Sequence, residues 1–229
     1  MRKIAKFFAI ALLATLAWAA TPKQNAAKRL QDAAEVLQEI MNVPDKSIPT
    51  EVVEHAKCIA VIPHEIKGGF VFGAKHGKGV ATCRTPHGWS APAFFSITGG
   101  SWGLQIGIEG VDNVLMIMNQ KGMDRLLSNK FQIGGEASAA AGPVGRHATA
   151  GTDWKLNTEI LSYSRSKGVF AGATLDGAWV SPDDASMMAF YGENATPKDV
   201  LSGKVLPPPA AKVFLAAVES AEEQAKKES

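Results

Sequence analysis

Apolar side chains recur every three or four positions between residues 26 and 41, in the segment AAKRLQDAAEVLQEIM. This spacing predicts an amphipathic helix, with Leu30 and Leu37 on the apolar face. Asp32, Glu35 and Glu39 make the polar face mostly acidic. We therefore expect the helix to pack on a protein core and not to lie on an anionic membrane.

Downstream the pattern changes to short runs rich in β-branched and aromatic residues, separated by Gly and Pro. Between residues 58 and 118 these runs are CIAVIP, GFVFGAK, GVATCRT, PAFFSIT, GLQIGI and NVLMIM. Later runs with the same character are TEILSYSR, GVFAGATL and GAWV. Repeated short strands with tight turns are typical of an antiparallel sheet or barrel.

Further helices are predicted from start signals and periodicity. Thr50 reads as the cap of a short helix, and KGMDRLLS as a single helix. The sequences at 181–184 and 196–199 each combine a capping residue, a proline and an acidic first turn. An amphipathic helix, AAKVFLAAVESAEEQAKK, closes the chain. The fold class is therefore α+β: an antiparallel β-sheet curled into a barrel-like body, with flanking N- and C-terminal helices.

The first 19 residues have the organisation of a secretory signal peptide. Arg2, Lys3 and Lys6 precede an apolar run and the small-residue site at 17–19. The run is shorter than a comfortable membrane span of roughly 20 residues, and no Cys follows the cleavage site. We expect a soluble periplasmic or secreted chain, with residues 20–229 forming a single domain whose core spans about 30–218.

Removal of the signal peptide changes the charge balance. The chain has 24 Lys and Arg against 22 Asp and Glu, and cleavage removes three of the basic residues, which leaves a net charge of −1. Nucleic-acid binding loses its support, because such proteins usually carry a basic face or a high domain pI.

Cys58 and Cys83 are the two cysteines of the chain. In an oxidising compartment they are expected to join neighbouring strands as a disulfide, with two separately buried thiols as the alternative. Two cysteines alone do not make a zinc site, and the five histidines show no metal-ligand spacing. Neither a metal nor any other cofactor is expected.

Ser101 lies in a G-x-S-x-G sequence, GGSWG, which matches the nucleophile elbow of serine hydrolases. A true elbow needs a helix after the serine, whereas the following residues, LQIGI, alternate as a strand does. His147 is the one histidine after Ser101. We interpret Ser101 as a strand or turn residue, keep a hydrolase as the third hypothesis, and expect no catalytic residues.

Two other segments raise the question of phosphate binding. The glycine-rich run at 133–153 lacks both common phosphate-loop patterns and favours a close-packed strand and turn. Between residues 65 and 87, four cations, Lys67, Lys75, Lys78 and Arg84, meet one acidic residue, Glu65. This basic cluster is either a solvated hairpin surface or a site for an anionic headgroup.

The ordered segments AKCIAVIP, KGGFVFGAKHGKGVATCR, GGSWGLQIG, FQIGGEASAAAGPVGR and EILSYSRSKGVFAGATLDGA resemble the SYLF domain family. The similarity runs from about residue 30 to about 218. It implies a lipid-binding domain, because eukaryotic members bind phosphoinositides and other acidic lipids, and some bind actin. A bacterial exported member would have no actin as a native partner. The resemblance also implies that GGSxGxQIG is a structural segment.

The leading hypothesis is non-catalytic binding of an anionic lipid or membrane surface in the bacterial cell envelope. Lys67, Lys75, Lys78 and Arg84 are the predicted lipid-binding residues. The alternative is a structural or stress-related envelope protein that binds another protein.

Overall fold

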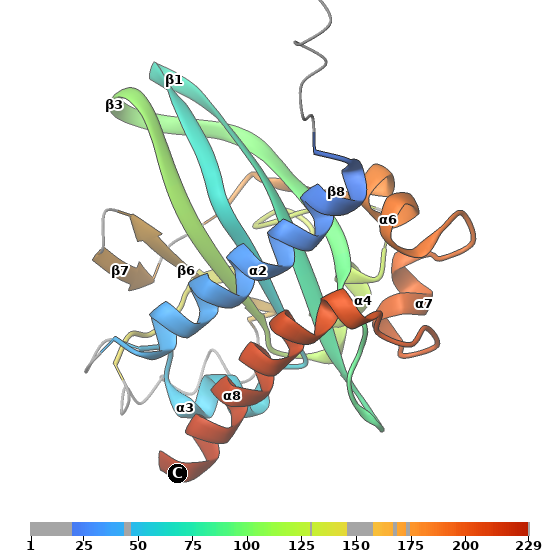
Figure 1. Ribbon diagram of the computed structural model, residues 1–229. Helices are drawn as coiled ribbons and strands as arrows, with labels where there is room; N and C mark the ends of the chain where they lie inside the picture. Colours follow the sequence, from blue (N-terminus) through green and yellow to red (C-terminus); the bar gives the residue numbers. More distant parts are fainter. Residues whose placement is uncertain are drawn as a thin grey trace, which may run out of the picture.

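A computed structural model describes residues 20–43, 47–128, 130–145, 158–166, 169–172 and 175–228. Its centre is a curled sheet of eight strands, and two long helices, α2 and α8, lie side by side across it (Figure 1). The α+β class and the barrel-like curl predicted from the sequence are confirmed. The proposed signal peptide, residues 1–19, lies outside the described residues.

Two helices precede the long strands, one follows them, and the others gather near the end of the chain. The α-helices are α2 (Pro22–Met41), α3 (Thr50–His55), α4 (Gln120–Leu126), α6 (Asp184–Tyr191), α7 (Pro197–Leu201) and α8 (Lys212–Glu228), the last preceded by a 3₁₀ turn, η1 (Pro209–Ala211). The strands are β1 (Cys58–Thr85), β2 (Gly88–Trp89), β3 (Ala93–Ile117), β4 (Phe131–Gln132), β5 (Ala139–Ala141), β6 (Ile160–Ser166), β7 (Val169–Gly172) and β8 (Trp179–Pro182).

Two very long strands replace the six short ones predicted between residues 58 and 118. β1 has 28 residues and β3 has 25, and they pair antiparallel along nearly their whole length. The glycines expected to form turns lie within the ladder, for example in the pair Gly69↔Gly107. A residue without a Cβ tolerates sharp bending. The ribbon therefore bends and continues where separate hairpins were expected.

The bent ribbon folds back on itself, so the two ends of β1 meet (Figure 1). The backbone N–H of Arg84 donates to the carbonyl of Lys57 at 2.8 Å. At Gly79 an added Cβ would lie 2.7 Å from the carbonyl oxygen of Val61, so the crossing requires glycine there. Cys58 and Cys83 form a disulfide across this closure, with a Cα–Cα distance of 4.0 Å. The predicted bond is confirmed, although both cysteines belong to one strand.

The remaining strands extend the ribbon on both sides. The second half of β3 pairs with β6, and its first half pairs with β8. Strand β7 continues antiparallel from β6, whereas β5 pairs with β6 in parallel. Among the described strands, the pairing is thus antiparallel apart from β5 with β6.

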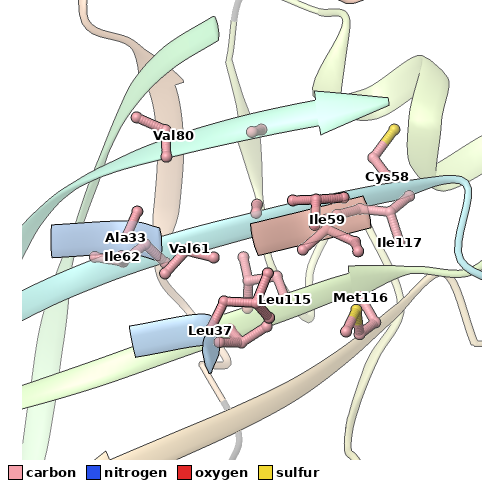
Figure 2. Close-up of a cluster of buried hydrophobic side chains, with 14 of the residues drawn as sticks. Ala33, Leu37, Cys58, Ile59, Val61, Ile62, Val80, Leu115, Met116 and Ile117 are labelled. Carbon is pink, nitrogen blue, oxygen red and sulfur yellow. The ribbon is translucent and has the colours of Figure 1, made fainter. Parts of the chain in front are cut away.

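The apolar face of α2 covers this sheet, as its periodicity predicts. Leu30, Leu37 and Ile40 are fully buried. In Figure 2, Ala33 and Leu37 of α2 lie over Val61 of β1 and Leu115 of β3, inside one cluster of buried side chains. Burial of such side chains stabilises the fold by about 1.5–3 kcal/mol each.

Helix starts agree with the sequence in part. Thr196 caps α7 with Pro197 in its first turn, as predicted. Two predicted caps are displaced. Thr50 is the first residue of α3, and Pro49 occupies the cap position before it. Asp183 caps α6, because Pro182 still belongs to β8. The side chain of Asp183 accepts from the backbone N–H of Ser186. A carboxylate at a helix start satisfies free N–H groups better than Ser181 would from its place in the strand.

Candidate functional site

A groove of about 280 Å³ lies between the first half of α2 and both arms of β1. Its walls carry several cationic or titratable side chains and one carboxylate. They are formed by Asn25, Lys28, Arg29, Asp32, Pro63, His64, Ile66, His76, Gly77 and Lys78. We call this the α2–β1 groove.

Strand alternation decides which β1 side chains reach the groove. In the returning arm, His76 and Lys78 are exposed, whereas Lys75, Gly77 and Gly79 are buried on the other face. Lys78 stands 47% exposed at the groove. Lys28 of α2, 67% exposed, supplies a second accessible ammonium and pairs with Asp32 at 2.6 Å.

Asp183, at the start of α6, holds the groove wall together. Its Oδ2 accepts from Arg29 Nη1 at 2.9 Å, from Lys78 Nζ at 3.0 Å and from Ser186 Oγ at 2.7 Å. Burial alone would raise the pKa of this carboxyl, but the hydrogen bonds from Ser186, Lys78 and Arg29 outweigh it and lower the pKa to about 2. Arg29 is itself nearly buried and lies over the Phe94 ring. It therefore acts as an anchor, and Lys28 and Lys78 remain as the accessible cations.

A bulge in β1 forms the outer lip of the groove. The β1–β3 register shifts between Ile62 and Glu65, and His64 there has a positive φ of 54°. Asp112 Oδ1 accepts from the His64 backbone N–H at 2.9 Å, and Asp112 Oδ2 accepts from Arg165 Nη2 at 2.8 Å. This bonding holds a conformation that is unusual for a residue with a Cβ. The imidazole and the next apolar side chain, Ile66, are left 71% and 55% exposed.

Lys67 and Lys75 belong to a different environment, on the inner side of the curled ribbon. Lys75 is only 7% exposed, and burial lowers its pKa despite the nearby Glu65. Lys67 Nζ lies 3.7 Å from Glu65 Oε2, and the same oxygen accepts from Asn113 Nδ2 at 2.9 Å. The expectation that these hairpin lysines share an exposed surface is wrong for Lys75.

Arg84 is a structural residue at the opposite end of the ribbon. Its guanidinium donates to Glu222 Oε1 at 2.8 Å and to the carbonyls of Ala56 and Val53. It also lies 4.5 Å from the Trp89 ring centroid. Burial alone would raise the pKa of Glu222, but hydrogen bonds from Lys226, Arg84 and Trp89 lower it to about 2. Of the four predicted lipid-binding residues, Lys78 alone lines the α2–β1 groove.

Ser101 lies within β3, paired with Gly73, and the strand continues to Ile117. The predicted strand position is confirmed, and no helix follows the serine. His147 lies outside the described residues.

Within the described ranges, no three His, Cys, Asp or Glu side chains come together as metal ligands. None of the helices in the described part of the chain is long and apolar enough to cross a membrane.

Sequence reasoning missed Lys28, His64 and His76 as groove residues. Lys28 belongs to a helix whose polar face is mostly acidic, and the histidines have no metal-ligand spacing that would mark them. The alternation of His76 and Lys78 along one strand was a usable signal. Nothing in the sequence showed that this strand face would lie beside α2.

Comparison with known proteins finds a matching protein family. The family model described as "Ysc84: Las17-binding protein actin regulator" matches residues 98–221. Protein YSC84 of Saccharomyces cerevisiae is 37% identical over 181 residues, which is 77% of this chain and 38% of the yeast protein. LAS seventeen-binding protein 3 of the same species is 35% identical over 180 residues, 77% of this chain and 39% of that protein.

A mammalian relative extends the match. SH3 domain-containing YSC84-like protein 1 of Rattus norvegicus is 33% identical over 189 residues, which covers 82% of this chain and 54% of the rat protein. The chain therefore spans about two fifths to one half of these relatives. One of these names refers to Las17 binding, and the family description adds actin regulation.

Proposed function

Because the chain belongs to the Ysc84 family of SYLF-domain proteins, we propose that it is a non-catalytic module that binds anionic lipid surfaces through the α2–β1 groove. The observation that carries this proposal is the pair of exposed ammonium groups, Lys28 and Lys78, on facing walls of one groove. A phosphate that contacts both ammonium groups would accept hydrogen bonds from two sides of the groove. Each cation near an anionic membrane surface contributes about 1 kcal/mol to binding.

The local charge favours an anion only moderately. Lys28, Arg29 and Lys78 face the carboxylates of Asp32 and Asp183, which leaves a net formal charge of +1 when the histidines are neutral. A mature protein with a net charge of −1 has little long-range attraction to a bilayer, so this local excess has to act at short range.

Ile66 supplies the apolar part of the proposed contact. It is 55% exposed at the lip of the groove, beside the bulge that projects His64. A large aliphatic side chain next to cations suits a membrane interface, where headgroups and acyl chains adjoin. On this proposal the groove takes the headgroup and Ile66 enters the interfacial region.

The expected site of action is the cell envelope, because the signal-peptide pattern at 1–19 predicts export. Sequencing the N-terminus of protein recovered from outside the cytoplasm tests this directly. A first residue of Ala20 supports export with cleavage after Ala19, and an intact Met1 in all recovered protein contradicts it.

A second candidate function is binding of a protein partner, which the family description and the name of one yeast relative favour. The family description refers to Las17 binding and actin regulation. For this chain the partner would belong to its own compartment. This candidate is favoured if such a partner protein binds without lipid and still binds a variant that lacks the groove cations.

Vesicle co-sedimentation tests the lipid proposal. The mature protein is expected to pellet with phosphatidylglycerol vesicles, to be released by high salt, and to remain in the supernatant with phosphatidylcholine vesicles. A Lys28→Gln/Lys78→Gln variant removes both exposed groove cations and is expected to lose roughly 2 kcal/mol of binding, about thirty-fold in affinity.

The matched control is Lys57→Gln/Lys227→Gln, which removes two exposed charges outside the groove. It is expected to keep most of the wild-type affinity. Equal weakening of the two double variants would show that net charge alone matters and would remove the groove as the site. No pelleting of the wild type would favour the protein-partner candidate.

A further inference from the structure

The α2–β1 groove carries two histidines in addition to its lysines, one on each arm of β1. His64 lies on the outward arm at the bulge, and His76 lies on the returning arm two residues before Lys78. Both are exposed. Histidine is the side chain whose ordinary charge change occurs between pH 5 and 8. We propose that the groove is a pH-dependent anion site whose affinity rises as these two imidazoles gain protons, an inference that rests on the proposed function.

The surrounding charges determine how much each proton adds. From α2, the groove faces Lys28, Arg29 and Asp32; from β1, Lys78. Asp183 of α6 bonds to Arg29 and Lys78 from behind. Its pKa of about 2 keeps it ionised throughout the range in which histidine titrates. Protonation of both histidines therefore raises the formal charge of the groove from +1 to +3, while the charge of Asp183 does not change.

The two histidines are not equivalent. His64 Nδ1 lies 3.4 Å from Asp112 Oδ1, and Asp112 is also bonded to Arg165 of β6, which pairs in turn with Glu39 of α2. A protonated His64 directs its Nδ1–H toward this carboxylate, so one of its two N–H donors is not available to an anion in the groove. His76 lies on the same strand face as Lys78, one alternation away. Its proton adds to an existing cation, so His76 is expected to carry the larger share of the response.

The experiment measures affinity for phosphatidylglycerol vesicles at pH 7.5 and pH 5.5 and at fixed ionic strength. The headgroup of this lipid is a phosphodiester, which keeps one negative charge over that range. Two added cations at an anionic surface correspond to a rise of up to about thirty-fold for the wild type. His64→Gln is expected to keep more of this rise than His76→Gln, and the double variant to lose most of it.

Two further variants make the result specific. His87→Gln removes an exposed histidine at the β1–β2 turn, outside the groove, and is expected to keep the full pH response. His76→Arg fixes a positive charge in the groove, so it is expected to bind more tightly than wild type at pH 7.5 and to respond less to pH. Circular dichroism at both pH values checks that every variant stays folded.

The possible failures are distinguishable. If the wild type binds anionic vesicles with salt sensitivity but equally at both pH values, the pH-dependent site is refuted and the proposed function stands. The same conclusion follows if the His64→Gln/His76→Gln variant keeps the full rise. If the wild type binds at neither pH, the proposed function fails and this inference fails with it.

Discussion

Replacing Arg84 with glutamine separates a structural role for this residue from a lipid-binding one. In the fold its guanidinium links the end of β1 to α3 and α8, through hydrogen bonds of 2.8 Å to Glu222 and 2.9 Å to the Ala56 carbonyl. A third bond reaches the Val53 carbonyl at 3.2 Å. The substitution removes all three donors and the contact with the Trp89 ring.

The magnitude follows from what is left behind. Glu222 keeps Trp89 Nε1 at 2.9 Å and Lys226 at 2.8 Å, so its carboxylate is not stranded. The carbonyls of Val53 and Ala56 lose charged donors, and hydrogen bonds to charged groups contribute about 1.5–3 kcal/mol each. Because water partly replaces these bonds, we expect a loss of about 2–4 kcal/mol in the free energy of unfolding, or roughly 5–15 °C in Tm.

Urea denaturation at pH 7 measures this loss, and Lys204→Gln is the control. Lys204 is 68% exposed and pairs with the partly exposed Asp199, so its loss is expected to leave the free energy of unfolding close to that of wild type. Arg84→Gln is also expected to leave vesicle affinity within about twofold of wild type when both are fully folded. The structural account of Arg84 is refuted if unfolding is unchanged while vesicle binding falls tenfold.

Three other substitutions test other parts of the account. Lys75→Met should flatten the pH dependence of stability on the alkaline side. Burial lowers the pKa of Lys75, so the folded state releases this proton at a lower pH than the unfolded state does, and wild-type stability rises as pH increases toward 10.5. Urea midpoints from pH 7 to 10 measure this rise. Cys58→Ala/Cys83→Ala should lower the free energy of unfolding by about 3 kcal/mol, because the disulfide closes a loop of 25 residues; two reactive thiols in denatured, unreduced wild type would contradict the bond. Ser101→Ala should leave any esterase signal unchanged, and stoichiometric labelling of Ser101 by a fluorophosphonate probe would overturn the non-catalytic interpretation.

The sequence predicted elements whose signals are local. The periodicity of residues 26–41 identified the buried face of α2, and the two cysteines on predicted strands identified the disulfide. Thr196 and Pro197 marked the start of α7 because capping depends on neighbouring residues only.

The bend of the ribbon was not predictable in the same way. Gly68-Gly69 and Gly99-Gly100 have the composition of turns, yet these residues remain in continuous strands. Whether paired glycines form a turn or a bend depends on the partner strand, which keeps its hydrogen bonds through the curve. Local composition does not contain that information.

The candidate site was predictable only in part. Which side chains line it depends on the alternation of side chains along β1 and on tertiary packing. Lys75 and Lys78 are three residues apart, an odd interval, so they face opposite sides of β1. Which side becomes the interior depends on the curl of the ribbon. The groove also needs Lys28, about 50 residues away in sequence, and this juxtaposition exists only after α2 packs on the sheet.

The most direct measurement of the central claim is where the protein touches an anionic membrane. An environment-sensitive fluorophore on Ile66→Cys, prepared with the native disulfide intact, reports at the lip of the α2–β1 groove. The same label on Leu206→Cys, at a side chain that is 86% exposed but outside the groove, is the control. On phosphatidylglycerol vesicles the label at position 66 should shift to the blue and be quenched by lipid-borne quenchers, while the label at position 206 should not respond. A response at position 206 with none at position 66 would contradict the account.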